Sequence, residues 1–263
     1  MKHFFKMLAL VLFITMYNHV DVNAQQKSDQ HVKNIILVHG AYADGSGWEG
    51  VYAILKKQGY QVTVTQQTLR DLNDDITIVE RAIASQDGPC ILVAHSYGGV
   101  LISAAGNDPK VAGLVYIAAH VPDAGELRTE LVKKFPSAFK SLIKGEDGLN
   151  YIDPAQFPED FAGDLPVEKA GFMANAQLPT ADKVFRVAIQ KAAWKSKPSF
   201  YMVAEADRII NPDLERFYAK RAQSKTIVEI KGGSHAIFAS RPKEVAKLIA
   251  EAANYHYNHP MSN

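Results

Sequence analysis

A run of ten residues, ILVAHSYGGV at positions 91–100, restricts the possible fold of this chain more than any other segment. The apolar residues at 91–94 are typical of a buried strand, and a helix-forming segment begins at Val100. Ser96 lies between them, with small residues on both sides that allow a strand and a helix to cross closely. The run therefore predicts a strand, a sharp turn that carries Ser96 and a helix, which is the arrangement of a nucleophile elbow. Ala94 replaces the first glycine of the usual G-x-S-x-G pattern and keeps that position small.

Six apolar runs have the length and composition of buried strands, and segments with helical spacing separate most of them. This alternation predicts a three-layer α/β fold, with a mostly parallel sheet of about six strands covered by helices on both faces. The chain has 263 residues, 47% of them hydrophobic, which is enough for one large core. The predicted strands are 34–38, 61–65, 90–95, 113–118, 199–204 and 226–230.

Residues 122–197 interrupt the alternation, between the fourth and the fifth predicted strand. This insertion holds six prolines with helical stretches between them, and it predicts a helical cap over the sheet. We expect some of its large side chains to line a substrate pocket and others to form a small core of the cap, without assigning them individually. The side chains in question are Phe135, Phe139, Phe157, Phe161, Phe172, Met173, Phe185 and Trp194.

The N-terminal segment has the pattern of a secretory signal peptide. Lys2 and Lys6 precede an apolar run at 7–17, and a small-x-small triplet ends at Ala24. An uncleaved membrane anchor is the alternative, but the run is shorter than the roughly 20 apolar residues that span a bilayer. We therefore expect residues 1–24 to be removed, leaving a single domain at 25–263. The sequence thus predicts an exported bacterial protein, periplasmic or secreted, without a membrane partner after cleavage.

Charge and cysteine content exclude several other classes of protein. Residues 25–263 contain 27 basic and 27 acidic side chains, so we expect no nucleic acid as partner. Cys90 is the only cysteine, which excludes an internal disulfide, and its place in an apolar strand predicts a buried, unreactive thiol. No feature of the sequence indicates an oligomeric state.

Three chemically active residues follow predicted strands. Ser96 ends the third strand, Asp207 follows the fifth and His235 follows the sixth. The carboxyl ends of parallel strands meet at one edge of the sheet, where ligands bind. A neutral imidazole can take the proton of a serine hydroxyl, and a buried carboxylate can fix the imidazole tautomer. Asp123 after the fourth strand and Glu205 are the alternative acids, but Asp207 has the more fitting position before the histidine.

The backbone near Ser96 predicts a site for a negatively charged oxygen. The amide of Tyr97 directly follows the candidate nucleophile, and the loop after the first strand supplies a second amide. We expect that second donor to be Ala41, with Tyr42 as the alternative, and we expect His39 to orient the loop by hydrogen bonding. His95 is the variable position of the elbow, while His120 lies near the expected pocket. The sequence predicts no cofactor and no metal ion.

Several segments resemble the α/β-hydrolase superfamily, and within it the small bacterial serine hydrolases related to plant methyl esterases and hydroxynitrile lyases. The similar segments include VHGAYADGSGW, LVAHSYGGVLISAAG and GGSHAIFASRPKEVAKLI, and together such segments cover nearly all of residues 33–250. The resemblance implies a cofactor-free serine hydrolase with Ser96, Asp207 and His235 at the matching positions. Hydroxynitrile lyases of this group carry a lysine after the catalytic histidine, where this chain has Ala236, so cyanohydrin cleavage is disfavoured.

The sequence thus predicts hydrolysis of a carboxylic ester through an acyl-enzyme, with a mainly apolar small molecule as substrate. Two alternatives remain open. The first is a sensor that keeps the three residues but binds a small ligand and signals through the cap. The second is other chemistry of the same triad, namely perhydrolysis, amide cleavage or carbon–carbon bond hydrolysis.

Overall fold

The structure is a computed structural model that describes residues 31–255. The predicted signal peptide at 1–24 lies outside these residues. Residues Val32–Ala253 form one compact unit. Among the helices of the described part, none has both the length and the apolar character needed to cross a membrane.

Six strands form one sheet in which every neighbouring pair is parallel, in the order β2-β1-β3-β4-β8-β9. This confirms the predicted α/β fold. The two central strands carry continuous apolar runs because both of their faces are covered by other parts of the chain. The strands are β1 (Asn34–Val38), β2 (Gln61–Val64), β3 (Cys90–Ser96), β4 (Val111–Ala119), β8 (Ser199–Ala204) and β9 (Thr226–Ile230).

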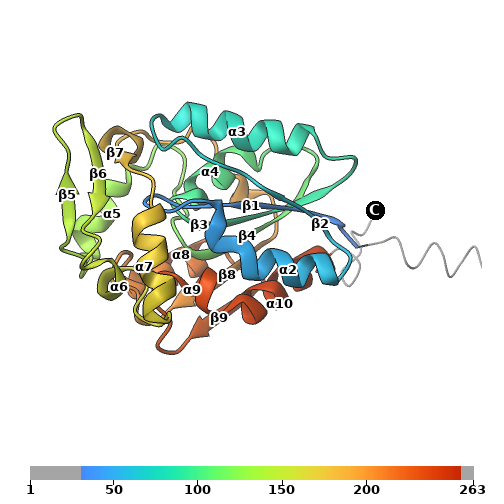
Figure 1. Ribbon diagram of the computed structural model, residues 1–263. Helices are drawn as coiled ribbons and strands as arrows, with labels where there is room; N and C mark the ends of the chain where they lie inside the picture. The colour runs from blue at the N-terminus through green and yellow to red at the C-terminus, as the bar shows by residue number, and fades with distance from the viewer. Residues whose placement is uncertain (1–30, 256–263) are drawn as a thin grey trace, which may run out of the picture. The chain divides into compact units, whose positions relative to one another are not determined.

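Helices cover the two faces of this sheet. Helices α3 and α4 pack together on one face, and α2 and α10 pack together on the other (Figure 1). Side-chain caps fix two of the helix starts, since Asp71 accepts a hydrogen bond from the Asn73 amide and Asn211 accepts one from the Asp213 amide. The helices are α2 (Glu49–Lys57), α3 (Leu72–Ala84), α4 (Gly98–Ala105), α8 (Pro212–Arg221), α9 (Ile237–Ser240) and α10 (Pro242–Ala253), with a 3-10 turn, η1 (Gly45–Trp48), before α2.

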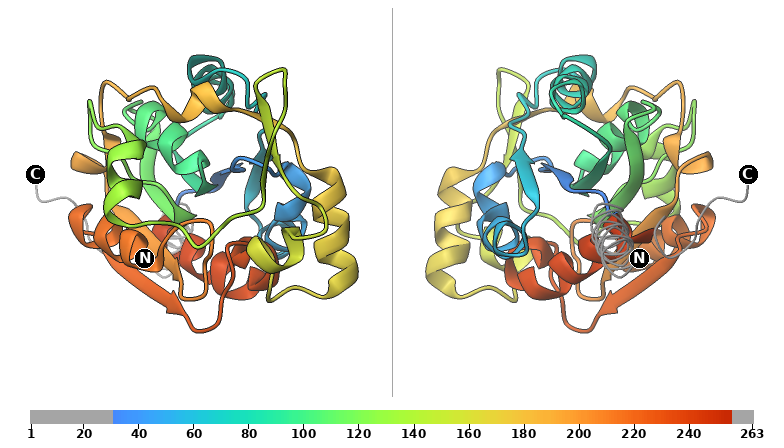
Figure 2. Two further views of the ribbon diagram at one scale, coloured as in Figure 1. Left: turned by 90° about the vertical axis from the view of Figure 1, so that its left-hand side faces the viewer. Right: turned by 90° about the vertical axis from the view of Figure 1, so that its right-hand side faces the viewer.

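The segment between β4 and β8 groups at the end of the sheet where the parallel strands finish (Figures 1 and 2). It contains the expected helical pieces and, in addition, a three-stranded antiparallel sheet in the order β5-β6-β7. The sequence did not reveal this small sheet because its strands have only two to four residues, too few for a clear alternation. The elements are α5 (Arg128–Lys134), β5 (Leu142–Lys144), β6 (Leu149–Ile152), α6 (Phe157–Asp160), α7 (Val167–Ala176), β7 (Thr180–Ala181), η2 (Asp182–Phe185) and η3 (Ala193–Lys195).

The sheet core holds the predicted buried thiol. Cys90 is fully buried at the start of β3, and burial raises the pKa of its thiol to about 12. A thiol with such a pKa remains protonated at neutral pH and is a poor nucleophile.

Helix α4 lies very close to the end of β4. A Cβ atom added at Gly99 would lie 2.2 Å from the backbone oxygen of His120 and 3.0 Å from the Ala119 side chain. The end of β4 and the start of α4 cannot move apart without shifting the turn at Ser96, because the His120 amide donates a hydrogen bond to the Ser96 carbonyl. The position therefore requires glycine.

We expect Gly99→Ala to lower the free energy of unfolding by about 1–3 kcal/mol, because the added methyl group overlaps backbone atoms. Gly171→Ala in α7 is the matched control, since an added Cβ there meets nothing within 4 Å. The control should raise stability by about 0.5–1 kcal/mol through helix propensity. Urea unfolding curves measure both values, and equal stabilities for the two variants would contradict the close approach.

Candidate active site

Ser96 occupies a strained turn between β3 and α4. Its φ angle is 53°, in the left-handed region that non-glycine residues seldom adopt. The register between β3 and β4 also shifts between His95 and Ser96, so the strand stops at this residue. The loop after β1 passes directly beside it, because a Cβ at Gly40 would lie 2.6 Å from the Ser96 Cβ. The turn is thus fixed by close contacts from neighbouring segments.

The structure brings Ser96, His235 and Asp207 into one hydrogen-bonded chain. The Ser96 hydroxyl donates to Nε2 of His235 over 2.9 Å, and Nδ1 of His235 donates to Oδ2 of Asp207 over 2.5 Å. Ser96 and Asp207 are each 5% exposed and His235 is fully buried. The three side chains come from the ends of β3, β8 and β9, as their positions in the sequence predict. Such an arrangement can move a proton from the hydroxyl to the imidazole.

Backbone amides orient the Asp207 carboxylate. Its Oδ1 accepts hydrogen bonds from the amides of Ile209 at 2.7 Å and Ile210 at 2.8 Å, which leaves Oδ2 for His235. The alternative acids have other partners. Asp123 forms an ion pair with Lys195 at 2.6 Å, and Glu205 is exposed and accepts a hydrogen bond from the Gly232 amide.

His95 holds the backbone that carries His235, a role that sequence analysis missed. Its Nε2 lies 2.9 Å from the His235 carbonyl oxygen, so Nε2 carries the proton and donates it. Burial, and then the charge of His235, lower the pKa of His95 well below its ordinary value, which keeps the ring neutral. The ring stacks on Phe238 with 4.1 Å between centroids. The only signal in the sequence was a histidine inside an otherwise apolar strand.

The inserted segment also contacts the His235 loop. The Phe161 carbonyl accepts a hydrogen bond from the Ala236 amide at 3.0 Å, and the Phe161 ring meets the His235 ring edge-on at 4.8 Å. Asp164 accepts hydrogen bonds from the Ser234 hydroxyl at 2.5 Å and the Ser240 hydroxyl at 2.7 Å. The loop is therefore held on both sides of the imidazole.

Two backbone amides beside Ser96 have no protein acceptor. Within residues 31–255, the amides of Ala41 and Tyr97 donate no hydrogen bond, and both residues line the cavity next to Ser96. The amide of Tyr42, the alternative donor, is already bonded to the Thr180 hydroxyl at 3.2 Å. These are the amides that the sequence predicts for an anionic oxygen, and the geometry leaves Ala41 rather than Tyr42 available.

Side chains fix the positions of these two amides. His39 accepts a hydrogen bond from the Gln67 amide at Nε2 and donates one from Nδ1 to the Gly40 carbonyl, each over 2.9 Å. The Tyr97 hydroxyl donates to Oδ2 of Asp75 over 3.2 Å. The sequence indicated the part played by His39 but not Asp75, which lies 22 positions away on α3.

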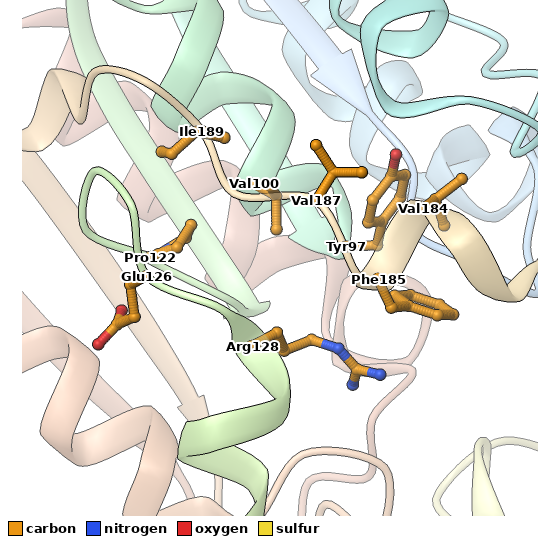
Figure 3. A pocket seen from close by; sticks show the side chains of 9 residues that line it. All are labelled: Tyr97, Val100, Pro122, Glu126, Arg128, Val184, Phe185, Val187 and Ile189. Atoms are coloured by element: carbon orange, nitrogen blue, oxygen red, sulfur yellow. The ribbon is translucent and has the colours of Figure 1, made fainter.

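A cavity of about 200 Å³ opens beside Ser96 and His235. The inserted segment supplies the apolar side chains of Val132, Phe139, Leu142 and Phe185 to its wall. His120 also lines it, 3.3 Å from the Tyr218 hydroxyl, and burial, followed by the charge of Arg128, lowers its pKa well below the ordinary value. A smaller crevice shares Tyr97, Arg128 and Phe185 with this cavity (Figure 3).

The remaining large side chains of the insertion lie elsewhere. Phe157, Phe161 and Met173 are buried, Phe172 is 61% exposed and the Trp194 indole donates to the Pro122 carbonyl at 2.9 Å. Phe135 packs against Phe217 of α8. Both expected roles therefore occur, in different residues.

A buried carboxyl group lies behind Asp207. Glu215 of α8 is fully buried, and its Oε2 accepts a hydrogen bond from the Ala204 amide at 3.0 Å. Burial, and then the charge of Asp207, raise the pKa of Glu215 well above its ordinary value. The carboxyl group of Glu215 therefore keeps its proton to higher pH in the folded protein than in the unfolded chain.

A family model described as "Alpha/beta hydrolase family" matches residues 35–248. The chain belongs to the α/β hydrolase family. This α/β hydrolase is 26% identical over 258 residues to Methylesterase 7 of Arabidopsis thaliana, covering 84% of this chain and 96% of that protein. It is also 26% identical to Pyrethroid hydrolase of Sphingobium wenxiniae, over 85% of this chain and 88% of the relative.

A solved structure shows the same α/β hydrolase architecture. The crystal structure of a pyrethroid hydrolase from Sphingobium faniae matches with a TM-score of 0.74 and 25% sequence identity. The match covers 86% of this chain and 99% of that one. These relatives are consistent with the resemblance that the sequence motifs indicate.

Glu215→Gln should change how stability depends on pH. The folded protein retains a proton on Glu215 that the unfolded chain loses above about pH 4.3, so the folded state loses relative stability as pH rises. Glutamine cannot ionise and removes this loss. We therefore expect the melting temperature of the variant, relative to the unsubstituted protein, to increase from pH 5 to pH 8.

Calorimetric melting curves across this pH range measure the difference. Glu168→Gln, which removes an exposed carboxylate of α7, is the matched control for the change in net charge. A melting difference for Glu215→Gln that stays constant or shrinks with rising pH would contradict a neutral Glu215.

Proposed function

We propose that this protein is a serine hydrolase that cleaves a carboxylic ester of a small molecule through an acyl-enzyme. The hydrogen-bonded chain of Ser96, His235 and Asp207 at the wall of a cavity is the observation that carries the proposal. A hydroxyl that is paired with an imidazole and opens to a cavity has both an activating base and space for a substrate.

In the proposed first half-reaction, the Ser96 oxygen attacks the ester carbonyl carbon while Nε2 of His235 takes the hydroxyl proton. Asp207 keeps the other imidazole nitrogen protonated and stabilises the imidazolium that forms. The tetrahedral intermediate then breaks its bond to the alcohol oxygen. His235 returns the proton to this oxygen, the alcohol leaves and the acyl group stays on Ser96.

In the second half-reaction, a water molecule attacks the acyl carbon and His235 takes its proton. The bond to the Ser96 oxygen breaks, His235 returns the proton to that oxygen and the carboxylic acid is released. In both steps, the amides of Ala41 and Tyr97 would donate hydrogen bonds to the negative carbonyl oxygen. Two such fixed donors lower the barrier because they need not reorganise during the reaction.

The cavity supports a small-molecule substrate with an apolar portion. Its volume of about 200 Å³ holds a small organic ester, and Val132, Phe139 and Leu142 supply an apolar surface. The names of the relatives, a methylesterase and a pyrethroid hydrolase, support the same reaction class. Ala236 remains the feature that argues against cyanohydrin cleavage.

We further propose that the enzyme acts outside the cytoplasm after removal of residues 1–24, because their basic start, apolar run and small-x-small end fit a signal peptide. Expression of the full chain in a bacterial host should yield a periplasmic or secreted product that begins at Gln25. Intact mass measurement of the purified product checks this. A cytoplasmic product that retains residues 1–24 would contradict it.

Ser96→Ala should abolish hydrolysis of p-nitrophenyl esters, with kcat reduced by about 10⁴-fold or more, because the nucleophile is lost. The same variant should no longer be labelled by a fluorophosphonate probe. Ser103→Ala is the matched control, since Ser103 is a buried serine of α4 that does not line the cavity. The control should retain labelling and turnover, and thermal melting verifies that both variants fold. Labelling of Ser96→Ala would rule out Ser96 as the nucleophile.

A further inference from the structure

Arg128 places a positive charge in the wall of the cavity that holds Ser96 and His235. It is the first residue of α5, in the inserted segment, and it lines both this cavity and the adjoining crevice. In Figure 3 the guanidinium group lies beside the ring of Phe185. Their separation is 4.2 Å between the guanidinium carbon and the ring centroid, a cation–π contact that holds the group in position.

No acidic side chain of the described residues forms an ion pair with this group, and the attraction from Asp182 acts only through space. Within residues 31–255, Arg128 forms no ion pair and donates no hydrogen bond, and its Nε is buried without a partner. The Nε of Arg221 is likewise buried without a partner, but Glu126 accepts hydrogen bonds from both terminal nitrogens of Arg221, at 2.8 and 2.9 Å. An arginine held without a carboxylate in a partly buried site is costly unless water or a ligand satisfies it.

The acids that line the same two cavities as Arg128 are already paired with other cations. Asp182, which lines the same cavity, forms an ion pair with Arg186, and Glu126 in the adjoining crevice is paired with Arg221. His120 adds no charge, because its lowered pKa keeps it neutral. The cavity therefore presents a cation that has no direct acidic partner to whatever binds beside Ser96.

We propose that the substrate carries, besides its ester group, a carboxylate that Arg128 binds. This inference rests on the proposed esterase function and specifies its substrate class. A guanidinium presents paired N–H donors that match the two oxygens of a carboxylate, and charge-assisted bonds of this type are among the stronger polar contacts. The apolar wall of Val132, Phe139 and Leu142 accommodates the carbon chain or ring that joins the two groups.

Two matched pairs of esters test the proposal. Monomethyl adipate and methyl hexanoate differ by a carboxylate on the acyl side, while 4-acetoxybenzoate and phenyl acetate differ by one on the alcohol side. The measurement is kcat/KM for each ester, expressed as the anionic-to-neutral ratio of each pair. For Arg128→Met, we expect this ratio to fall by about tenfold to a hundredfold in at least one pair, as the loss of a charged hydrogen-bonded contact predicts.

Two further variants separate a local contact from general charge or packing effects. Arg128→Lys keeps the charge without the paired donors, so it should retain part of the preference for the anionic ester. Lys133→Met removes a cation from the same helix, where the side chain is 72% exposed, and should leave both ratios unchanged. Unchanged ratios for Arg128→Met in both pairs, or an equal fall for Lys133→Met, would overturn the proposal.

Equilibrium binding distinguishes failure of this proposal from failure of the esterase function. If the unsubstituted protein hydrolyses no ester of either pair, the esterase function is contradicted, and titration calorimetry with adipate then tests Arg128 alone. At least tenfold weaker binding of adipate to Arg128→Met would support a carboxylate site. Equal binding to both proteins would overturn it.

Discussion

The close approach of three backbone segments around Ser96 is the constraint on which the rest of the site depends. The loop after β1 passes at Gly40, α4 begins directly after the serine and β4 ends against Gly99. Side chains larger than hydrogen do not fit at these two glycine positions. The same crowding holds Ser96 at a positive φ angle, which directs its hydroxyl toward His235. The backbone strain at Ser96 therefore reduces local stability and positions the hydroxyl oxygen of Ser96.

The imidazole depends on residues far from it in the sequence. His95 comes from the strand that carries Ser96, and it binds the backbone of His235. Phe161 and Asp164 come from the inserted segment, and they hold the residues on either side of the histidine. Because one loop is fixed from the sheet and from the insertion together, the position of the His235 imidazole depends on the packing of both.

The sequence predicted those parts of the fold that local pattern determines. The strands at 34–38, 199–204 and 226–230 coincide with the structure. The first two are mainly apolar and buried throughout. Strand 226–230 includes Glu229 and is only half-buried, because it lies at the edge of the sheet. The elbow followed from small residues around Ser96. The β5-β6-β7 sheet was missed because short, half-exposed strands leave no periodic signal.

Within the site, residues placed at strand ends could be located from the sequence, whereas those defined by their environment could not. Ser96, Asp207 and His235 follow strands whose ends must meet. In the sequence, nothing distinguishes Glu215 and Arg128 from the other charged residues of helices. Their significance comes from what surrounds them in three dimensions, namely a neighbouring carboxylate in one case and the lack of an acidic partner in the other.

Asp164 accepts hydrogen bonds from Ser234 and Ser240, which connects one part of the insertion to the histidine loop. The two parts of the insertion therefore differ in how freely their sequence can change. Residues around 161–164 contact the histidine loop, so their replacement would shift the position of His235. The β5–β6 hairpin contributes Leu142 to the cavity wall but has no such tie to His235 among the described contacts. Selection or engineering can therefore exchange the hairpin, and with it part of the cavity wall, while the hydrogen-bonded arrangement of Ser96, His235 and Asp207 is kept.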